Sequence, residues 1–181
     1  MTTDLSYLVG FLAGDGCFSK SCSQYIIGLW TPYPLIATRF AEKLRVCTGI
    51  SPAMYVRKDR KQVCVKLSSK VWFERLLPLR DQARRGFLVV DDEIPFVKGL
   101  FDAEGCLHNP SRKNEAITIS NASLPLLHLV RTILSGLGIE TTGPHPGAHC
   151  FQIYVRKASL PRFKSLIGTD KPHKGITERV A

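Results

Sequence analysis

Hydrophobic residues recur with two different periods along this chain, and each period predicts one type of secondary structure. Ile36, Phe40 and Leu44 are spaced four residues apart, which predicts a helix over residues 34–46. Apolar and polar residues alternate along residues 62–68, as in a strand that buries one face. Further strand-like runs cover residues 25–30, 54–57, 116–120 and 151–156. The mixture of both periods indicates an α+β (mixed α/β) fold.

Residues that begin and end helices define the remaining elements. Polar residues at positions 3–4 and in segment 91–95 predict the starts of two further helices. A helix over residues 124–137 is closed by Gly138, a residue suited to the left-handed position after a helix. The last helices are expected to begin at the N-cap residues Ser69 and Ser159. The predicted order of elements is αββαββα, twice.

The chain also repeats itself, because residues 7–18 and 96–107 are alike. The matched pairs, all separated by 89 residues, are Gly10/Gly99, Asp15/Glu104, Gly16/Gly105 and Cys17/Cys106. The same separation relates Gly49 to Gly138, so the similarity keeps its register beyond one short window. We therefore predict two homologous halves, residues 1–90 and 91–181.

Each of the two similar segments ends in an acidic residue followed by glycine. The small residues that precede or follow the acids are Gly10, Ala13, Gly14 and Gly16 in one half, and Gly99, Ala103 and Gly105 in the other. Small residues let two helix backbones approach closely, so Gly10 and Gly99 are predicted to lie where the helices pack. Gly16 and Gly105 are expected to end their helices in a left-handed conformation.

Packing of these helices would bring Asp15 and Glu104 together at adjacent helix C-termini. Both acids would oppose the helix dipoles and repel each other there, unless cations occupy the space between them. Hard divalent ions with oxygen ligands suit such a site. We therefore predict a site for Mg²⁺ (or Mn²⁺) with Asp15 and Glu104 as ligands, helped by the backbone carbonyls of Gly14 and Ala103.

Other interpretations of the polar residues are open at this point. The segment 14–16 has the composition of a tight turn, but the recurrence of an acid and a glycine after a matching helix argues against that interpretation alone. Asp102 is a third acid, and because its counterpart is Ala13 we expect it to be a helix cap or an exposed residue. A zinc site lacks the usual paired spacing among its candidates Cys106, His108, His145, His149 and Cys150.

Charge and apolar content narrow the class of partner. The formal net charge is +10, which favours a polyanionic partner, either nucleic acid or an anionic membrane surface. The first half carries +8 of this charge and the second half +2. The longest apolar run, residues 8–13 with its flanks, is far shorter than the ~20 residues that cross a bilayer. We expect no membrane association and an intracellular location, cytoplasmic and near the nucleoid, or nuclear or organellar in a eukaryote.

The polar faces of the predicted strands supply candidates for DNA contact. Both halves present such a face, and a cluster of basic residues lies beside the first one, which favours contact with base edges and phosphates over an ordinary solvated surface. The predicted DNA-binding residues are Arg57, Lys58, Arg60, Lys61, Gln62, Lys66, Thr118, Ser120, Gln152, Tyr154 and Arg156.

Residues 8–16 and 97–105 resemble the signature helices of the LAGLIDADG homing endonucleases, specifically the single-chain members with two motifs. In this resemblance Gly10 and Gly99 match the helix-packing glycine, and Asp15 and Glu104 match the metal-binding acid that ends each motif. The order of elements extends the resemblance over nearly the whole chain and leaves a variable tail from about residue 169.

The resemblance implies a saddle of two antiparallel sheets along the DNA major groove, with the paired helices at its centre. It also implies metal-dependent double-strand cleavage, a gene within an intron, and a polar or basic residue near each metal site. The candidates for that residue are Lys66 and Arg156, and Trp30 occupies a strand end where a polar group is expected. We expect a monomer, because both halves of a two-fold dimer are already joined.

The target DNA is expected to be long and imperfectly palindromic, because the two polar faces differ. At positions expected to be equivalent, the first half has Lys66 and Cys64 where the second half has Arg156 and Tyr154. Two alternatives are an intron-RNA maturase that uses the same saddle and a DNA-binding regulator that has lost cleavage. Retention of an acid in both motifs argues against the loss of cleavage.

Overall fold

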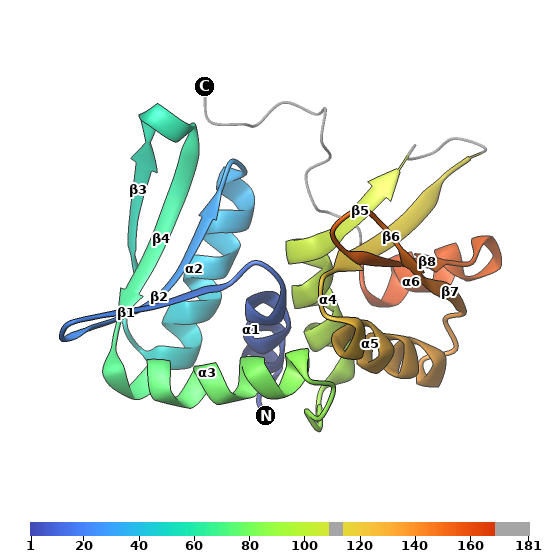
Figure 1. Cartoon of the computed structure of the whole chain (residues 1–181), viewed down its shortest axis with the longest axis horizontal. Coiled ribbons are helices and arrows are strands. Elements are labelled where there is room, and N and C mark those ends of the chain that lie inside the picture. The colour runs from blue at the N-terminus through green and yellow to red at the C-terminus, as the bar shows by residue number, and fades with distance from the viewer. Residues whose placement is uncertain (109–113, 169–181) are drawn as a thin grey trace.

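Two four-stranded antiparallel sheets, each backed by helices, flank a central pair of helices (Figure 1). This computed structural model describes residues 1–108 and 114–168. The strand order is β1-β2-β4-β3 in the first sheet and β5-β6-β8-β7 in the second, so both sheets have the same topology. The predicted mixed α/β fold of two αββαββα units is confirmed.

The elements of each unit follow one another in the same order along the chain. The first unit comprises α1 (Thr3–Gly14), β1 (Cys17–Ser21), β2 (Gln24–Thr31), α2 (Pro34–Thr48), β3 (Ala53–Arg57), the 3₁₀ turn η1 (Lys58–Arg60), β4 (Gln62–Ser68) and α3 (Lys70–Arg84). The second comprises α4 (Glu93–Glu104), β5 (Gly105–His108), β6 (Ala116–Asn121), α5 (Leu124–Gly136), β7 (Thr141–Pro146), β8 (Phe151–Val155), the 3₁₀ turn η2 (Lys157–Ser159) and α6 (Leu160–Leu166).

Helices α1 and α4 pack against each other through two glycines. A Cβ atom placed on Gly10 would lie 2.0 Å from the carbonyl oxygen of Phe96, and one on Gly99 would lie 2.0 Å from that of Tyr7. No side chain fits at either position, so the two backbones meet directly. Every residue of α1 from Leu5 to Gly14 is buried, as expected for a helix covered on all sides.

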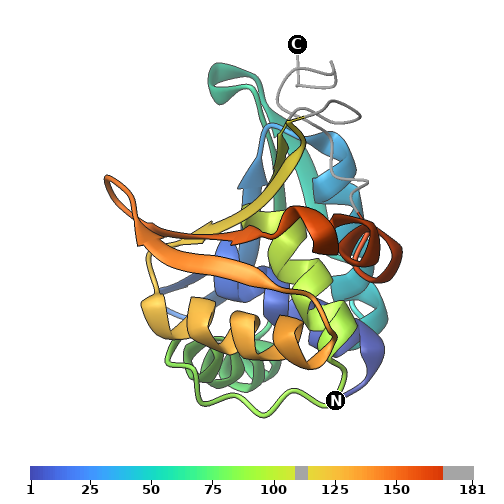
Figure 2. The same cartoon turned by 90° about the vertical axis from the view of Figure 1, so that its right-hand side faces the viewer.

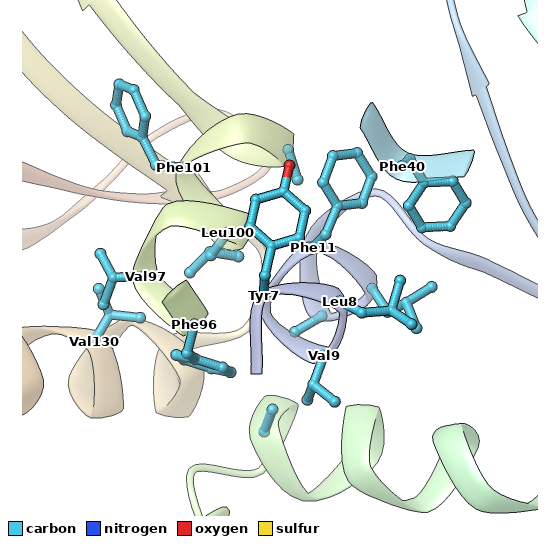
Figure 3. Packing of buried hydrophobic residues seen from close by; sticks show 14 of the residues in the cluster. Tyr7, Leu8, Val9, Phe11, Phe40, Phe96, Val97, Leu100, Phe101 and Val130 are labelled. Atoms are coloured by element: carbon cyan, nitrogen blue, oxygen red, sulfur yellow. The ribbon is translucent and has the colours of Figure 1, made fainter. Parts of the chain in front are cut away.

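Aromatic and aliphatic side chains fill the space around this helix pair (Figure 3). Phe11 of α1 stacks on Phe40 of α2 with ring centroids 4.9 Å apart, which joins the pair to the first unit. On the α4 side, Phe101 meets Phe163 of α6 edge to face at 5.2 Å. The pair therefore anchors both units in one hydrophobic core, and the ends of α1 and α4 are held in fixed positions.

The ends of these two helices differ from the sequence-based expectation. Neither Gly16 nor Gly105 has a positive φ, so the predicted left-handed ending is wrong for both. A Cβ atom on Gly16 would instead lie 2.4 Å from Leu12 Cδ2, and one on Gly105 would lie 2.0 Å from Phe101 Cδ2. Glycine is needed here because the chain turns directly beneath a side chain of its own helix.

Two further predicted caps are confirmed. Gly138 follows α5 with φ of +69°, and the Ser69 hydroxyl accepts a hydrogen bond from the amide of Trp72 at the start of α3. Gly49, which matches Gly138 in the repeat, follows α2 with φ of +71°. Ser159 lies at the predicted N-cap position of α6 but makes no capping hydrogen bond, because the preceding turn η2 already gives it a helical conformation. Its hydroxyl accepts a hydrogen bond from the amide of Glu140 instead.

The sheets bury one face against helices. Val63, Val65 and Leu67 of β4 lie on the covered face, and α2 and α3 pack against this sheet. Helix α5 covers the second sheet in the same way, as Figure 2 shows from the side. Within the described residues, no helix is long and apolar enough to span a membrane.

Candidate metal centre and nucleic-acid interface

The two predicted catalytic acids lie at the adjoining ends of α1 and α4. Asp15 is the residue that follows α1, and Glu104 is the last residue of α4. The two helices are in close contact here, since a Cβ atom on Gly14 would lie 2.7 Å from both Ala103 Cβ and Glu104 Cγ. Asp15 is exposed and Glu104 is half-buried. The structure therefore brings both carboxylates to one edge of the helix pair.

An arginine that the sequence analysis did not single out holds the end of α1. Arg84, in the last turn of α3, donates from Nε to the carbonyl oxygen of Ala13 and from Nη2 to that of Gly14, both at 2.9 Å. These carbonyls lack partners within their own helix, so the guanidinium satisfies them. The carbonyl of Gly14, predicted as a metal ligand, thus already accepts a hydrogen bond.

The same guanidinium is electrostatically coupled to both acids. Burial, followed by the nearby Arg80, lowers the pKa of Arg84, whereas Asp81, Glu104 and Asp15 act in the opposite direction. An arginine remains protonated despite such a shift, because its ordinary pKa lies far above neutral pH. Arg84 therefore places a permanent positive charge beside two carboxylates that repel each other.

Glu104 has a second partner, an amide at the end of β6. Asn121 donates from Nδ2 to Glu104 Oε1 at 2.8 Å, and its Oδ1 accepts from the amide of Ser123 at 2.8 Å. The Ser123 hydroxyl in turn donates to the backbone carbonyl of Arg84. A continuous set of hydrogen bonds thus runs from the end of α3 to Glu104.

The matching strand end of the first unit carries Thr31 in place of Asn121. Its hydroxyl accepts a hydrogen bond from the amide of Tyr33 at 3.3 Å, the same local turn that Asn121 makes with Ser123. From the sequence, we expected a polar group at such a strand end and found Trp30 there. Strands β2 and β6 each end one residue later than predicted, at Thr31 and Asn121, and both of these residues are polar.

The two basic residues proposed from the sequence lie elsewhere. Lys66 Nζ lies 5.3 Å from the ring centroid of Tyr55 and 6.0 Å from that of Trp30. Arg156 follows β8 and is 3.6 Å from the carboxylate of Glu140. Within the described residues, neither forms a hydrogen bond or an ion pair with Asp15 or Glu104. The basic residue that lies at the ends of α1 and α4 is Arg84.

Strand register changes which residues of the two sheets correspond. The matched Cys17 and Cys106 pair with Gly28 and Thr118, which pair in turn with Lys66 and Tyr154. Lys66 therefore corresponds to Tyr154 and not to Arg156 as expected, and by the same register Cys64 corresponds to Gln152. The two polar faces still differ, with a cation and a phenol at equivalent positions.

The remaining predicted DNA-binding residues occupy two regions. Arg57, Lys58, Arg60 and Lys61 form the tip of the β3–β4 hairpin, and Gln62 begins β4 beside them. Arg57 Nη2 donates to Asp59 at 2.6 Å, and this hydrogen bond lowers the pKa of Asp59. Part of the positive charge at the tip is therefore neutralised before any ligand arrives.

In the second sheet, the predicted residues are partly engaged with one another. Ser120 pairs with Gln152 in register, and Gln152 Oε1 accepts a hydrogen bond from the Tyr154 hydroxyl at 2.7 Å. Thr118 is buried, and its hydroxyl is 3.0 Å from Nε2 of His108. His108 is exposed and covers Thr118, but it was not among the predicted DNA contacts.

Asp102 is neither a cap nor an exposed residue, contrary to expectation. It is 1% exposed, and its carboxylate accepts hydrogen bonds from Tyr7 at 2.7 Å and Arg39 at 2.6 Å, with Lys98 Nζ 3.0 Å away. Burial and the Asp102 charge raise the pKa of Tyr7. This buried ion-pair cluster ties α1, α2 and α4 together, and removing one member would leave charge unpaired.

The chemistry of the donors at the helix ends fits a hard divalent cation. Two carboxylates and neighbouring backbone carbonyls are oxygen ligands, the kind that Mg²⁺ and Mn²⁺ prefer. Across residues 1–108 and 114–168, no group of three or more His, Cys, Asp or Glu side chains gathers as a metal site. Two of the alternative zinc ligands, Cys106 and His108, are in contact, with Sγ and Nδ1 3.9 Å apart.

Comparisons with known proteins agree with this arrangement. A family model described as a LAGLIDADG-like domain matches residues 91–168. The homing endonuclease I-ApeI of Aeropyrum pernix is 28% identical over 188 residues, covering 94% of this chain and 83% of that protein.

Solved structures show the same fold over nearly the whole chain. I-DmoI in complex with DNA and Mn matches with a TM-score of 0.72 at 21% identity, covering 93% of this chain and 97% of that one. The N-terminal LAGLIDADG domain of DUF199/WhiA matches with a TM-score of 0.68 at 18% identity, covering 93% and 84%. Residues 91–168 therefore match a LAGLIDADG-like domain, and the chain as a whole is similar in sequence to a homing endonuclease and has the fold of I-DmoI.

Proposed function

We propose that this chain is a site-specific endonuclease that hydrolyses double-stranded DNA with a divalent metal. The observation that carries the proposal is the meeting of Asp15 and Glu104 at the adjoining ends of α1 and α4, between two sheets with polar faces. The relative I-ApeI is a homing endonuclease, and I-DmoI has been solved with DNA together with Mn or Ca, which supports both the substrate and the kind of cofactor.

We propose a separate task for each residue of the site. Asp15 and Glu104 would hold Mg²⁺ or Mn²⁺, which when bound supplies a Lewis acid and an activated water for phosphodiester hydrolysis. Asn121 fixes the orientation of the Glu104 carboxylate through its 2.8 Å hydrogen bond. Arg84 fixes the end of α1 and offsets part of the repulsion between the two acids.

The sheets supply the surface for the substrate. Basic residues at the β3–β4 tip are placed to contact phosphates, and Lys66 and Tyr154 occupy equivalent positions on the two polar faces. Because these equivalent side chains differ, we propose a target whose two halves are related but not identical. The proposal extends to an intracellular monomer encoded within an intron, as the family resemblance implies.

Plasmid cleavage tests the proposal. The full chain is incubated with plasmids that carry a library of inserts, in Mg²⁺, Mn²⁺, Ca²⁺ or EDTA, beside the double variant Asp15→Asn/Glu104→Gln. We expect linear product from one insert with the wild-type chain in Mg²⁺ or Mn²⁺, and none in EDTA or with the double variant. Tight binding of an insert without cleavage in any metal would contradict an endonuclease and favour a DNA-binding regulator.

A further inference from the structure

A polar cavity lies between α5 and the start of β7, apart from the helix-end site. Its volume is about 490 Å³, within the range of small-ligand sites. Its lining includes the polar residues His128, Arg131, Thr132, Ser135, Glu140 and Arg156. Helix α5 covers the apolar face of the second sheet (Figure 2), so the cavity is on the helical side and away from the face that carries Gln152 and Tyr154.

One stripe of α5 supplies half of this lining. His128, Arg131, Thr132 and Ser135 follow the spacing i, i+3, i+4 and i+7, which places them on one side of the helix. The buried residues of α5 are Leu126, Leu127, Val130, Ile133 and Leu134. The stripe therefore presents hydrogen-bond donors to the cavity while the rest of the helix packs on the sheet.

Arg131 has a donor that the described residues do not satisfy. Its Nε atom is buried, and it finds no hydrogen-bond partner in residues 1–108 or 114–168. A buried donor of a charged group that lacks an acceptor is unfavourable, and such groups mark places where a ligand or ion completes the structure. Arg131 also lines the cavity, so a turn of its side chain would bring Nε to an anion bound there, which would supply the missing acceptor.

Arg156 adds a second guanidinium that is only loosely engaged. Its Nε is 3.6 Å from the carboxylate of Glu140, and the two side chains are 58% and 74% exposed. An ion pair this exposed is weak, so Arg156 can turn toward a better acceptor. With two arginines against one glutamate, the cavity carries a net positive charge.

We propose that this cavity binds a phosphate group. Arg131 and Arg156 would contact its oxygens, because guanidinium groups match the geometry of phosphate, and the hydroxyls of Thr132 and Ser135 would add neutral hydrogen bonds. The phosphate belongs either to the backbone of a nucleic acid that passes behind the second sheet or to a free polyphosphate. The inference does not rest on the proposed cleavage activity, because none of these residues belongs to the helix-end site.

Calorimetric titration with pyrophosphate at low salt tests the site in the wild-type chain and in Arg131→Gln and Arg156→Gln. Arg45→Gln is the matched control, because it removes one exposed positive charge from α2, the equivalent helix of the first unit. We expect Arg131→Gln to weaken binding about 10-fold, Arg156→Gln to weaken it less, and Arg45→Gln to leave it unchanged. Thermal melting shows which variants fold. If Arg131→Gln does not fold, Arg156→Gln still tests the site.

Absence of pyrophosphate binding by the wild-type chain would overturn the proposal. So would equal weakening by Arg45→Gln and Arg131→Gln, since that result reflects the overall charge of +10 and no particular site. The source of the phosphate follows from competition with labelled single-stranded RNA or DNA. Displacement by pyrophosphate from the wild-type chain, but not from Arg131→Gln, assigns the site to a polynucleotide backbone. Pyrophosphate binding without displacement assigns it to a free polyphosphate.

Discussion

The two ends of the central helix pair are alike in sequence and differ in what holds them. At the end of α1, Asp15 is exposed, and the last carbonyls of the helix accept hydrogen bonds from Arg84 of α3. At the end of α4, Glu104 is half-buried and accepts a hydrogen bond from Asn121 of β6. One end is held through its backbone by a cation, and the other through its side chain by an amide. A duplicated motif therefore does not imply two equivalent acids.

The physical cause of the difference lies outside the motifs. Thr31, at the position of Asn121, carries a hydroxyl that closes a local turn and has no amide group to donate. The first unit compensates with a longer last helix, since α3 spans Lys70–Arg84 and places an arginine at its far end. The helix described at this position in the second unit, α6, spans only Leu160–Leu166.

Loss of either carboxylate has the largest expected effect. Asp15→Asn and Glu104→Gln should each reduce cleavage more than about 100-fold, beyond the 10–100-fold loss typical of residues that only support a metal ligand. Melting temperature in EDTA should hold or rise, because each change removes one of two repelling charges. Glu74→Gln, an exposed acid on α3, is the control and should change neither measurement.

The cleavage products of these single variants show whether the two acids act separately or share a metal. Nicking of one strand by a single variant would show that each acid serves its own scissile phosphate, and loss of both cuts would show a shared metal. Normal cleavage by Asp15→Asn or by Glu104→Gln would remove that residue from the metal site.

Loss of the Asn121 amide, which supports Glu104, has the next largest expected effect. Asn121→Ala frees the Glu104 carboxylate and should raise the Mg²⁺ concentration for half-maximal cleavage about 10- to 100-fold. Thr31→Ala removes the equivalent side chain of the first unit and should leave that concentration unchanged, because its hydroxyl bonds only its own turn in the hydrogen bonds recorded here. Equal shifts in the two variants would refute the asymmetry between the units.

Arg84 should matter most when no metal is present. Arg84→Gln leaves two partly buried carbonyls with weaker partners and should lower the free energy of unfolding by about 1–3 kcal/mol in EDTA. The loss should shrink in Mg²⁺, since a bound cation would restore positive charge beside the acids. Urea denaturation measures both values, and Arg85→Gln, at the exposed neighbouring residue, is the control. An identical loss with and without Mg²⁺ would restrict Arg84 to a purely structural role.

The smallest expected effect concerns the tip of the β3–β4 hairpin. Lys58→Gln should reduce the slope of log binding constant against log salt by about 0.9, the value for one phosphate contact. Arg57→Gln should reduce it less, because Arg57 is already paired with Asp59 at 2.6 Å. Filter binding to nonspecific duplex DNA across a salt series measures the slopes. A larger reduction for Arg57 than for Lys58 would show that the Asp59 pair opens when DNA binds.

Much of the fold could be predicted because it depends on local patterns. The alternation along residues 62–68 predicted β4, and the N-cap residue Ser69 predicted the start of α3, both within a residue of the observed bounds. The 89-residue repeat extended each assignment to the other half of the chain. The capping hydrogen bond expected of Ser159 is absent because a 3₁₀ turn before α6 gives this residue a helical conformation, whereas capping residues normally have a non-helical one.

The candidate site was predictable only in part. Asp15 and Glu104 followed from the repeat, but Asp102 was placed wrongly because sequence spacing does not show that α1 and α2 cover its side of α4. The strand register also shows that Lys66 is equivalent to Tyr154 and not to Arg156. An alternating sequence pattern does not reveal which residues of neighbouring strands are paired.

The order of elements, the pairing of two glycine-bearing helices and the acids at their ends could be predicted from the amino-acid sequence, because period, small residues and repetition are properties of neighbouring positions. The surroundings of those acids depend on the tertiary fold. Arg84 reaches Ala13 across 71 positions of chain, and Asn121 reaches Glu104 from a different strand. Such contacts depend on how α3 and β6 pack against the helix pair, and side-chain packing between distant segments leaves no periodic signal in the sequence.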